Sequence, residues 1–202
     1  MKLFGTLTSP YTRKARLVLL EKQIPHQFVA EGPNDPGNEI AALNPLGRIP
    51  ALVLDDETCI FDSVVISEYL DTLNDTPILI PRNDALARMR VRRWEALADG
   101  IMDSAVVVRG ERVRAPEQQS DAVMELHNDN ITRTLAYAAQ QLGAQPWCEG
   151  GSLSLADLAL ASALLYLDLR QPERDWRAAH PALAAWFARM EVRSSVRTSM
   201  AA

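Results

Sequence analysis

The chain has 202 residues, 48% of them hydrophobic, 23% charged and 6% aromatic, which is the composition of a globular protein with a sizeable core. Collagen-like, disordered and membrane-embedded classes are thereby excluded. A net charge of -5 leaves no overall positive field for a phosphate backbone, so we expect no nucleic-acid partner.

The two cysteines and the N-terminus indicate a cellular compartment. Cys59 and Cys148 form no CxxC pair and predict neither a disulfide framework nor a metal site, which suits a reducing cytoplasm. The apolar stretch in residues 1–7 is too short for a signal peptide, and no later stretch is long enough to span a bilayer. We therefore expect a cytoplasmic protein that binds no metal and enters no membrane.

The first 30 residues predict a strand, a helix and a second strand. Residues 1–7 form the first strand, and residues 8–10 (Thr-Ser-Pro) provide an N-cap followed by a proline in the first helical turn. Apolar residues then recur at helical spacing until residues 24–25 (Ile-Pro) end the helix. With a strand over residues 26–30, this is a βαβ unit with parallel pairing and a right-handed crossover.

The next segment adds a short helix, a hairpin and a third helix. Residues 39–43 follow a loop rich in glycine and proline and allow only a short helix. Two apolar stretches, 51–54 and 58–61, flank an acidic turn and predict a β-hairpin. Residues 64–73 show helical spacing. The predicted order is βαβαββα, a small α/β domain over residues 1–75.

The character of the chain changes after this domain. Residues 76–82 contain two prolines and no clear period, so we assign them to a linker. No alternating strand pattern follows, and residues 83–202 are expected to form an all-α domain. Its helical patterns cover residues 83–113, 120–143, 154–169 and 181–190.

Ser9 stands where a strand ends and a helix begins. Backbone N–H groups and the helix dipole favour an anion at such a place, and a hydroxyl there can donate to a thiolate and lower its pKa. An N-cap alone also explains Ser9, and packing alone also explains Tyr11.

Pro50 directly precedes the first strand of the hairpin. A proline cannot donate to the sheet ladder, so it belongs at the start of the strand, and its peptide bond can be cis. A cis bond there would expose the N–H and C=O groups of Ile49 to a bound peptide. A simple end of the loop also explains Pro50.

Two further segments open helices. The side chains of Asp62 and Ser63, with the free N–H groups of the first turn, can hold the carboxylate and amine of a ligand, although capping explains them equally. Ser154 and Asp157 form a capping box flanked by a hydrophobic staple, which we interpret as structural.

In their order and spacing, these segments resemble the cytosolic-type glutathione S-transferases with a serine-type, omega-like site. The resemblance rests on residues 9–11 (Ser-Pro-Tyr), the stretch from Asn44-Pro45 to Ile49-Pro50, the Asp62-Ser63 pair and the capping box. It implies a thioredoxin-like N-terminal domain that binds glutathione, an all-α C-terminal domain that forms one wall of the electrophile pocket, and a homodimer.

The resemblance also assigns roles to residues of the first domain. Ser9 would activate the thiol of glutathione. Ile49, before a cis Pro50, would hold the cysteinyl part through its backbone. Asp62 and Ser63 would hold the γ-glutamyl end.

The walls of the site follow from the same resemblance. Tyr11 and Arg48 would line the glutathione site, while Tyr11, Met102 and Val106 would face the electrophile. Residues 31–45, where many members place further glutathione contacts, offer no match.

Three functions are compatible with these residues. The first is an enzyme that adds the thiolate of bound glutathione to a small hydrophobic electrophile. The second is a glutathione-dependent thiol transferase or peroxidase, which is less supported because Ser9 cannot form a mixed disulfide. The third is a non-catalytic module that keeps the fold and binds protein partners.

Overall fold

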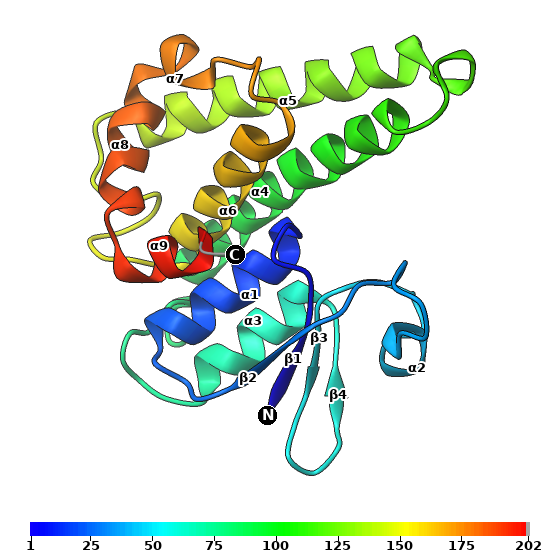
Figure 1. The fold of residues 1–202 in the computed structure, drawn as a ribbon. Coiled ribbons are helices and arrows are strands. Elements are labelled where there is room, and N and C mark those ends of the chain that lie inside the picture. Colours follow the sequence, from blue (N-terminus) through cyan, green and yellow to red (C-terminus); the bar gives the residue numbers. More distant parts are fainter. Residues whose placement is uncertain (201–202) are drawn as a thin grey trace. The chain divides into compact units, whose positions relative to one another are not determined.

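The computed structural model describes residues 1–200 (Figure 1). The chain divides into two compact units. The first comprises Met1–Pro81 together with the C-terminal segment that begins at Arg193, and the second comprises Arg82–Val192. In the described part of the chain, no helix combines the length and apolar character that crossing a membrane requires.

The first unit is built on a four-stranded mixed sheet in the order β2-β1-β3-β4. β1 pairs parallel with β2 and antiparallel with β3, and β3 pairs antiparallel with β4. The predicted βαβ unit and hairpin are therefore confirmed, with strands shorter than the apolar stretches. The strands are β1 (Lys2–Gly5), β2 (Gln27–Ala30), β3 (Ala51–Val53) and β4 (Cys59–Ile60).

Helices cover both faces of this sheet. Because successive side chains of a strand point to opposite faces, Leu3 and Phe4 are buried on different sides. Phe4 packs with Ile40 and Ala51 on the face that α2 covers, and α1 and α3 pack beside each other on the opposite face (Figure 1). The helices of this unit are α1 (Pro10–Glu21), α2 (Ile40–Leu43), α3 (Ser63–Thr72) and α9 (Ser194–Met200).

A buried ion pair fixes the segment that follows α3. The Nζ of Lys22 donates to Asp71 Oδ1 (2.9 Å) and to the carbonyls of Asn74 (3.0 Å) and Pro77 (2.7 Å). The Asp71 carboxylate accepts the backbone N–H groups of residues 79 and 80 at 2.8 and 3.1 Å. The start of the predicted linker is therefore held in place by buried polar contacts.

The C-terminal helix belongs to the first unit, although the sequence pattern assigns residues 83–202 to the all-α part. Glu21 of α1 accepts hydrogen bonds from Arg193 Nε (2.8 Å) and Nη2 (2.7 Å) and from the Ser195 hydroxyl. Arg16 donates to the carbonyl of Ser199 (3.1 Å). These partners lie at least 172 residues apart in the chain, so helical periodicity cannot reveal them.

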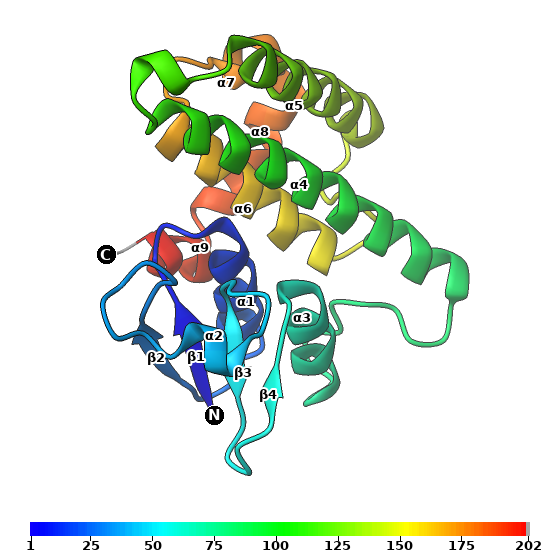
Figure 2. The same cartoon turned by 90° about the vertical axis from the view of Figure 1, so that its right-hand side faces the viewer.

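The second unit is entirely helical in its described residues. α4 packs against both α5 and α6 (Figure 2), and all but the last turn of α6 is buried. The four long predicted helices are confirmed, whereas the short helix α7 has no strong pattern and was not expected. The helices are α4 (Ala85–Arg112), α5 (Asp121–Leu142), α6 (Leu155–Arg170), α7 (Trp176–Ala179) and α8 (Pro181–Glu191), with a 3₁₀ turn at Pro116–Gln118.

The capping box of α6 is confirmed. The buried carboxylate of Asp157 accepts the N–H (2.9 Å) and the hydroxyl (3.0 Å) of Ser154 and the N–H of Cys148 (2.8 Å). Burial raises the pKa of Asp157, while these hydrogen bonds act against the rise. One carboxylate thus joins the start of α6 to the loop before it.

We predict that the first unit depends on the pair of Lys22 and Asp71. Lys22→Met or Asp71→Leu leaves an uncompensated buried charge, so each should lower the free energy of unfolding by about 3–5 kcal/mol, and the double variant should lose less than the two single losses combined. Urea denaturation measures the free energy of unfolding of the wild-type protein and of each variant. Asp55→Asn is the control, because Asp55 is 91% exposed in its ion pair with the N-terminus and should change stability by less than about 1 kcal/mol.

We also predict a pH-dependent contribution from Glu21. Burial alone would raise its pKa, but the hydrogen bonds from Arg193 and Ser195 and the charge of Arg193 outweigh burial and hold the pKa below its ordinary value. A depressed pKa stabilises the fold above the unfolded-state value of about 4.3, and the stabilisation disappears as the pH falls through the folded-state pKa.

Glu21→Gln should therefore destabilise the protein by about 1.5–3 kcal/mol at pH 7 and by much less near pH 3. Denaturation curves of both proteins at the two pH values test this, with the exposed Glu125→Gln as control. An equal difference at both pH values would contradict the assignment.

Candidate functional site

The strand directions bring three predicted segments to one edge of the sheet. Because β3 runs antiparallel to both β1 and β4, the C-terminal ends of β1 and β4 lie at the same edge as the start of β3 (Figure 2). Ser9 follows β1, Pro50 precedes β3, and Asp62 follows β4. Segments far apart in the sequence therefore share one edge.

Ser9 is the N-cap of α1. Its Oγ accepts the N–H of Thr12 (3.3 Å), and its own N–H donates to the carbonyl of Thr6 (3.2 Å). The side chain is half-buried, and its hydroxyl hydrogen is donated to no group within residues 1–200. Ser9 can therefore accept at the helix and donate to a ligand at the same time.

Side chains of α1 fix the loop that carries Ser9. Thr12 is fully buried against Gly5, where any added side-chain carbon would collide with it. Arg13 is also buried and donates from Nη2 to the carbonyl of Leu7 (3.2 Å). Burial lowers the pKa of Arg13, and the neighbouring charge of Arg16 lowers it further. Sequence analysis missed Arg13, because nothing in the helical pattern indicates that an arginine is buried.

The peptide bond between Ile49 and Pro50 is cis, as predicted. The N–H and C=O groups of Ile49 make no hydrogen bond with any other part of the described chain. Asn44, which is fully buried, donates to the carbonyl of Arg48 (2.7 Å) and accepts the N–H of Leu46 (3.0 Å). Asn44 thus shapes the loop that presents Ile49, a role that its turn-like sequence context does not reveal.

Asp62 and Ser63 stand at the start of α3. The exposed Asp62 is the N-cap and accepts the N–H of Val64 (3.0 Å). Ser63 is 4% exposed, and its hydroxyl makes no hydrogen bond within residues 1–200. A carboxylate, a hydroxyl and a helix N-terminus thus occupy adjacent positions, which suits a ligand that carries both an ammonium and a carboxylate group.

The remaining predicted residues have varied environments. Tyr11 is half-buried in the first turn of α1, and Arg48 is exposed in the loop before β3. On α4, Met102 is fully buried and Val106 is 38% exposed. Tyr11 and Arg48 therefore flank the segments at the sheet edge. Met102 does not face a ligand as expected, because its side chain is packed in the core of the second unit, whereas Val106 of the same unit is partly exposed.

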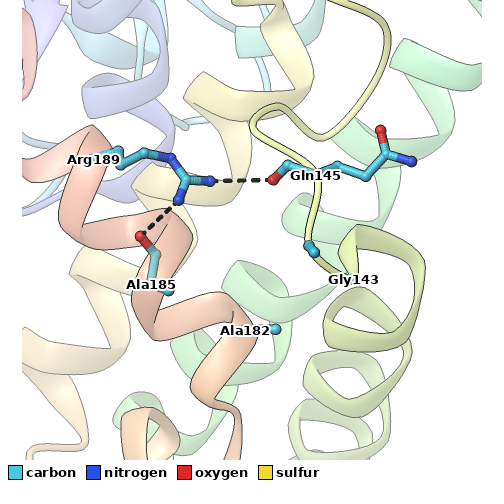
Figure 3. A pocket seen from close by; sticks show the side chains of 6 residues that line it. Gly143, Gln145, Ala182, Ala185 and Arg189 are labelled. Atoms are coloured by element: carbon cyan, nitrogen blue, oxygen red, sulfur yellow. Dashed lines mark hydrogen bonds between the residues drawn. The ribbon is translucent and has the colours of Figure 1, made fainter.

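A shallow hollow in the second unit contains none of the predicted site residues. Figure 3 shows Arg189 of α8 reaching the turn after α5, where its guanidinium donates to the carbonyl of Gln145 (3.1 Å) and to that of Ala185 (3.2 Å). Because the guanidinium group is already hydrogen-bonded to these carbonyls and most other lining residues are small, the hollow offers no catalytic group. The lining residues are Gly143, Ala144, Gln145, Ala182, Ala185 and Arg189.

No cluster of histidine, cysteine, aspartate or glutamate that could hold a metal occurs in the part of the chain that the structure describes.

Comparisons with known proteins agree with this architecture. Residues 8–73 match the model of the glutathione S-transferase N-terminal domain, and residues 121–189 match that of the C-terminal domain. The chain is 39% identical to an uncharacterized GST-like protein, YibF, from Escherichia coli, over 91% of this chain and 90% of that protein.

Solved structures of whole proteins are also similar. One is a glutathione S-transferase from Methylobacillus flagellatus with glutathione bound, with a TM-score of 0.96 and 42% identity over 100% of this chain and 99% of the other. Another is a glutathione S-transferase from Methylobacterium radiotolerans in complex with glutathione sulfonate, with a TM-score of 0.94 and 35% identity over 98% and 93%. This chain belongs to the glutathione S-transferase family, with its thioredoxin-like first unit and helical second unit.

Proposed function

We propose that this protein is a glutathione S-transferase that adds the thiolate of bound glutathione to a small hydrophobic electrophile, a reaction typical of detoxification. The observation that carries the proposal is the convergence of Ser9, the unpaired backbone of Ile49 and the Asp62-Ser63 pair at one sheet edge. Similar proteins with glutathione or glutathione sulfonate bound support the choice of ligand.

Each group of the edge suits one part of glutathione. The N–H and C=O groups of Ile49 pair with the backbone of the cysteinyl residue. The Asp62 carboxylate accepts from the γ-glutamyl ammonium group, while the Ser63 hydroxyl and the N-terminus of α3 donate to the neighbouring carboxylate. Tyr11 and Arg48 flank the peptide.

Ser9 donates to the sulfur and stabilises the thiolate. The thiolate forms a C–S bond with the electrophile, whose leaving group departs with the bonding electrons or whose double bond accepts them, and the thiol proton passes to solvent. A thiol of pKa about 8.5 is roughly 3% ionised at pH 7, and lowering its pKa by about two units makes roughly three-quarters of it thiolate.

Ionisation alone supplies a modest part of the acceleration. The nucleophilicity of a thiolate falls with its pKa at a Brønsted slope near 0.5. The lower pKa therefore reduces the reactivity of the thiolate about tenfold and leaves a net rate gain of a few-fold. Orientation of the thiolate against the electrophile contributes several kcal/mol more. The residues that hold the electrophile, among which we propose Tyr11 and Val106, therefore decide the substrate.

We predict separate effects for Ser9→Ala and Asp62→Asn. Ser9→Ala should lower the turnover of a chloronitrobenzene electrophile by about ten- to hundredfold, shift its pH profile toward the free thiol pKa, and change the dissociation constant of glutathione by less than about threefold. Asp62→Asn keeps an N-cap side chain but removes the charge, so it should weaken glutathione binding about tenfold or more.

Calorimetric titration with reduced glutathione and steady-state kinetics measure both effects. The controls are Thr8→Ala, which removes an exposed neighbouring hydroxyl, and Asp84→Asn, which neutralises the N-cap of α4. Absence of glutathione binding to the wild-type protein at millimolar concentration would overturn the proposed function and favour a protein-interaction module.

We further propose that the protein is a homodimer and works in the cytoplasm. Val65 of α3 and Leu73, the C-cap of that helix, are 50% and 41% exposed, and the α4 residues Leu86 and Met89 are 53% and 47% exposed. Apolar side chains in such number on two helices are typical of a covered surface. Free cysteines Cys59 and Cys148 suit a reducing compartment.

Sedimentation should give twice the chain mass of 22.4 kDa at micromolar concentration. A double variant, Val65→Glu with Met89→Glu, should be monomeric, because charges in a buried interface are strongly unfavourable. Val192→Glu is the matched control, since Val192 is 61% exposed and lies outside both helices. A monomeric wild-type protein would contradict the proposal.

A further inference from the structure

Arg13 of α1 is a buried cation without a negative partner. It is 7% exposed, and its Nη2 donates to the carbonyl of Leu7 (3.2 Å). Its Nε and Nη1 are buried and make no hydrogen bond within residues 1–200, and no described carboxylate forms an ion pair with it. Arg16, whose charge acts on Arg13, is also positive. The guanidinium group therefore lacks the compensation that buried charges normally have.

The place of Arg13 in α1 makes its charge more unfavourable still. Arg13 is the fourth residue of α1, and its N–H donates to the carbonyl of the N-cap Ser9 (3.0 Å). The first turn of this helix contains no acidic residue. Because the N-terminal end of a helix dipole is positive, it repels a cation and favours an anion. A negative charge bound at this end would therefore be stabilised by the dipole and by Arg13 together.

The side chain of Arg13 extends toward the end of α1 where Ser9 lies. Side chains of an α-helix lean toward its N-terminus, and residues four apart share one face. The hydrogen bond to Leu7 agrees with this direction, because Leu7 precedes the helix. The guanidinium group is thus attached to the loop that carries the Ser9 hydroxyl. Since Arg13 is buried, water screens its charge little, and the charge acts on a group bound at Ser9.

We propose that Arg13 is a positioning residue of the glutathione site, whose bond to Leu7 holds the Ser9 loop and whose unpaired charge favours the thiolate of bound glutathione over the thiol. The inference rests on the proposed function and adds a second source of thiol activation, which does not touch the sulfur. Ser9 supplies a hydrogen bond, and Arg13 supplies a positive field. The thiol proton passes to solvent, and the guanidinium group stays charged throughout.

Anchoring of the loop and stabilisation of a charge have different effects on different ligands. An arginine that only holds the carbonyl of Leu7 would affect the binding of all glutathione derivatives equally. A charge that favours the thiolate would affect derivatives with a negative sulfur group most. Glutathione sulfonate carries such a charge at neutral pH, whereas S-methylglutathione has a neutral thioether in its place. The relative affinity of these two compounds therefore separates the two roles.

The test measures the dissociation constants of both derivatives by calorimetry at pH 7 and low ionic strength, and their ratio is the readout. We expect the wild-type protein to prefer the sulfonate. Arg13→Met and Arg13→Gln, which remove the charge, should each lower this preference about tenfold, whereas Arg13→Lys should retain most of it. Lys2→Met is the matched control, because it removes an exposed cation at the opposite end of β1 and should leave the ratio unchanged.

The pKa of the glutathione thiol in the complex gives a second readout, measured from the ultraviolet absorbance of the thiolate with S-methylglutathione as the blank. We expect Arg13→Met and Arg13→Gln to raise this pKa by about one unit, a tenfold change in the ionisation constant. Arg13→Lys should stay closer to the wild-type value. Because the glutamine variant can still donate to Leu7, it separates the charge from the anchoring of the loop even if the methionine variant does not fold.

Two results would overturn this inference while leaving the proposed function intact. One is a wild-type protein that binds glutathione but does not prefer the sulfonate. The other is a preference and a thiol pKa that removal of the Arg13 charge leaves unchanged, including the case in which all Arg13 variants weaken both derivatives equally. A wild-type protein that binds neither glutathione nor either derivative would instead refute the proposed function, and this inference with it.

Discussion

The mixed pairing of the small sheet is the constraint on which the candidate site depends. Since β3 is antiparallel to both of its neighbours, the C-terminal ends of β1 and β4 lie at the same edge as the start of β3. Three unlike chemical groups reach that edge: a hydroxyl at a helix N-terminus, an unpaired peptide group and a carboxylate beside a second helix N-terminus. A shift of β3 by one residue would turn its side chains to the opposite face and displace the Ile49 backbone from the other two groups.

The two interpretations of Ser9, capping residue and activating residue, are compatible in the structure. A serine oxygen has two lone pairs and one hydrogen, so accepting the N–H of Thr12 leaves the hydrogen available for a ligand. The accepted bond also polarises the O–H group and strengthens it as a donor. Capping therefore orients the hydroxyl beside the positive end of the α1 dipole, where a negative sulfur is favoured.

Local patterns were sufficient for much of the fold. Period, turn residues and capping residues predicted the βαβ unit, the hairpin, the four long helices and the capping box of Asp157, while the cis bond before Pro50 was implied by the family resemblance. They failed where a polar side chain is satisfied by a distant partner. Lys22, the C-cap of α1, looks like a surface residue, yet it is buried because it pairs with Asp71, which lies 49 residues further along the chain. The same limit hides the attachment of α9, which depends on contacts between segments rather than on local spacing. The burial of Arg13 is hidden for another reason, since helical spacing alone does not indicate a buried arginine.

The attachment of α9 to α1 has a consequence for the order of folding. The chain leaves the first unit at Pro81, builds the whole second unit, and only then supplies Arg193 and Ser195, which bind Glu21. On a ribosome, where folding proceeds from the N-terminus, the thioredoxin-like unit emerges first but lacks α9 until the whole second unit has been made. Contacts over so long a sequence separation form late, because a large loop must close before they contribute. The carboxylate of Glu21 thus gains Arg193 and Ser195 only after the second unit has been synthesised, so α9 docks onto α1 after the helices between them have been made.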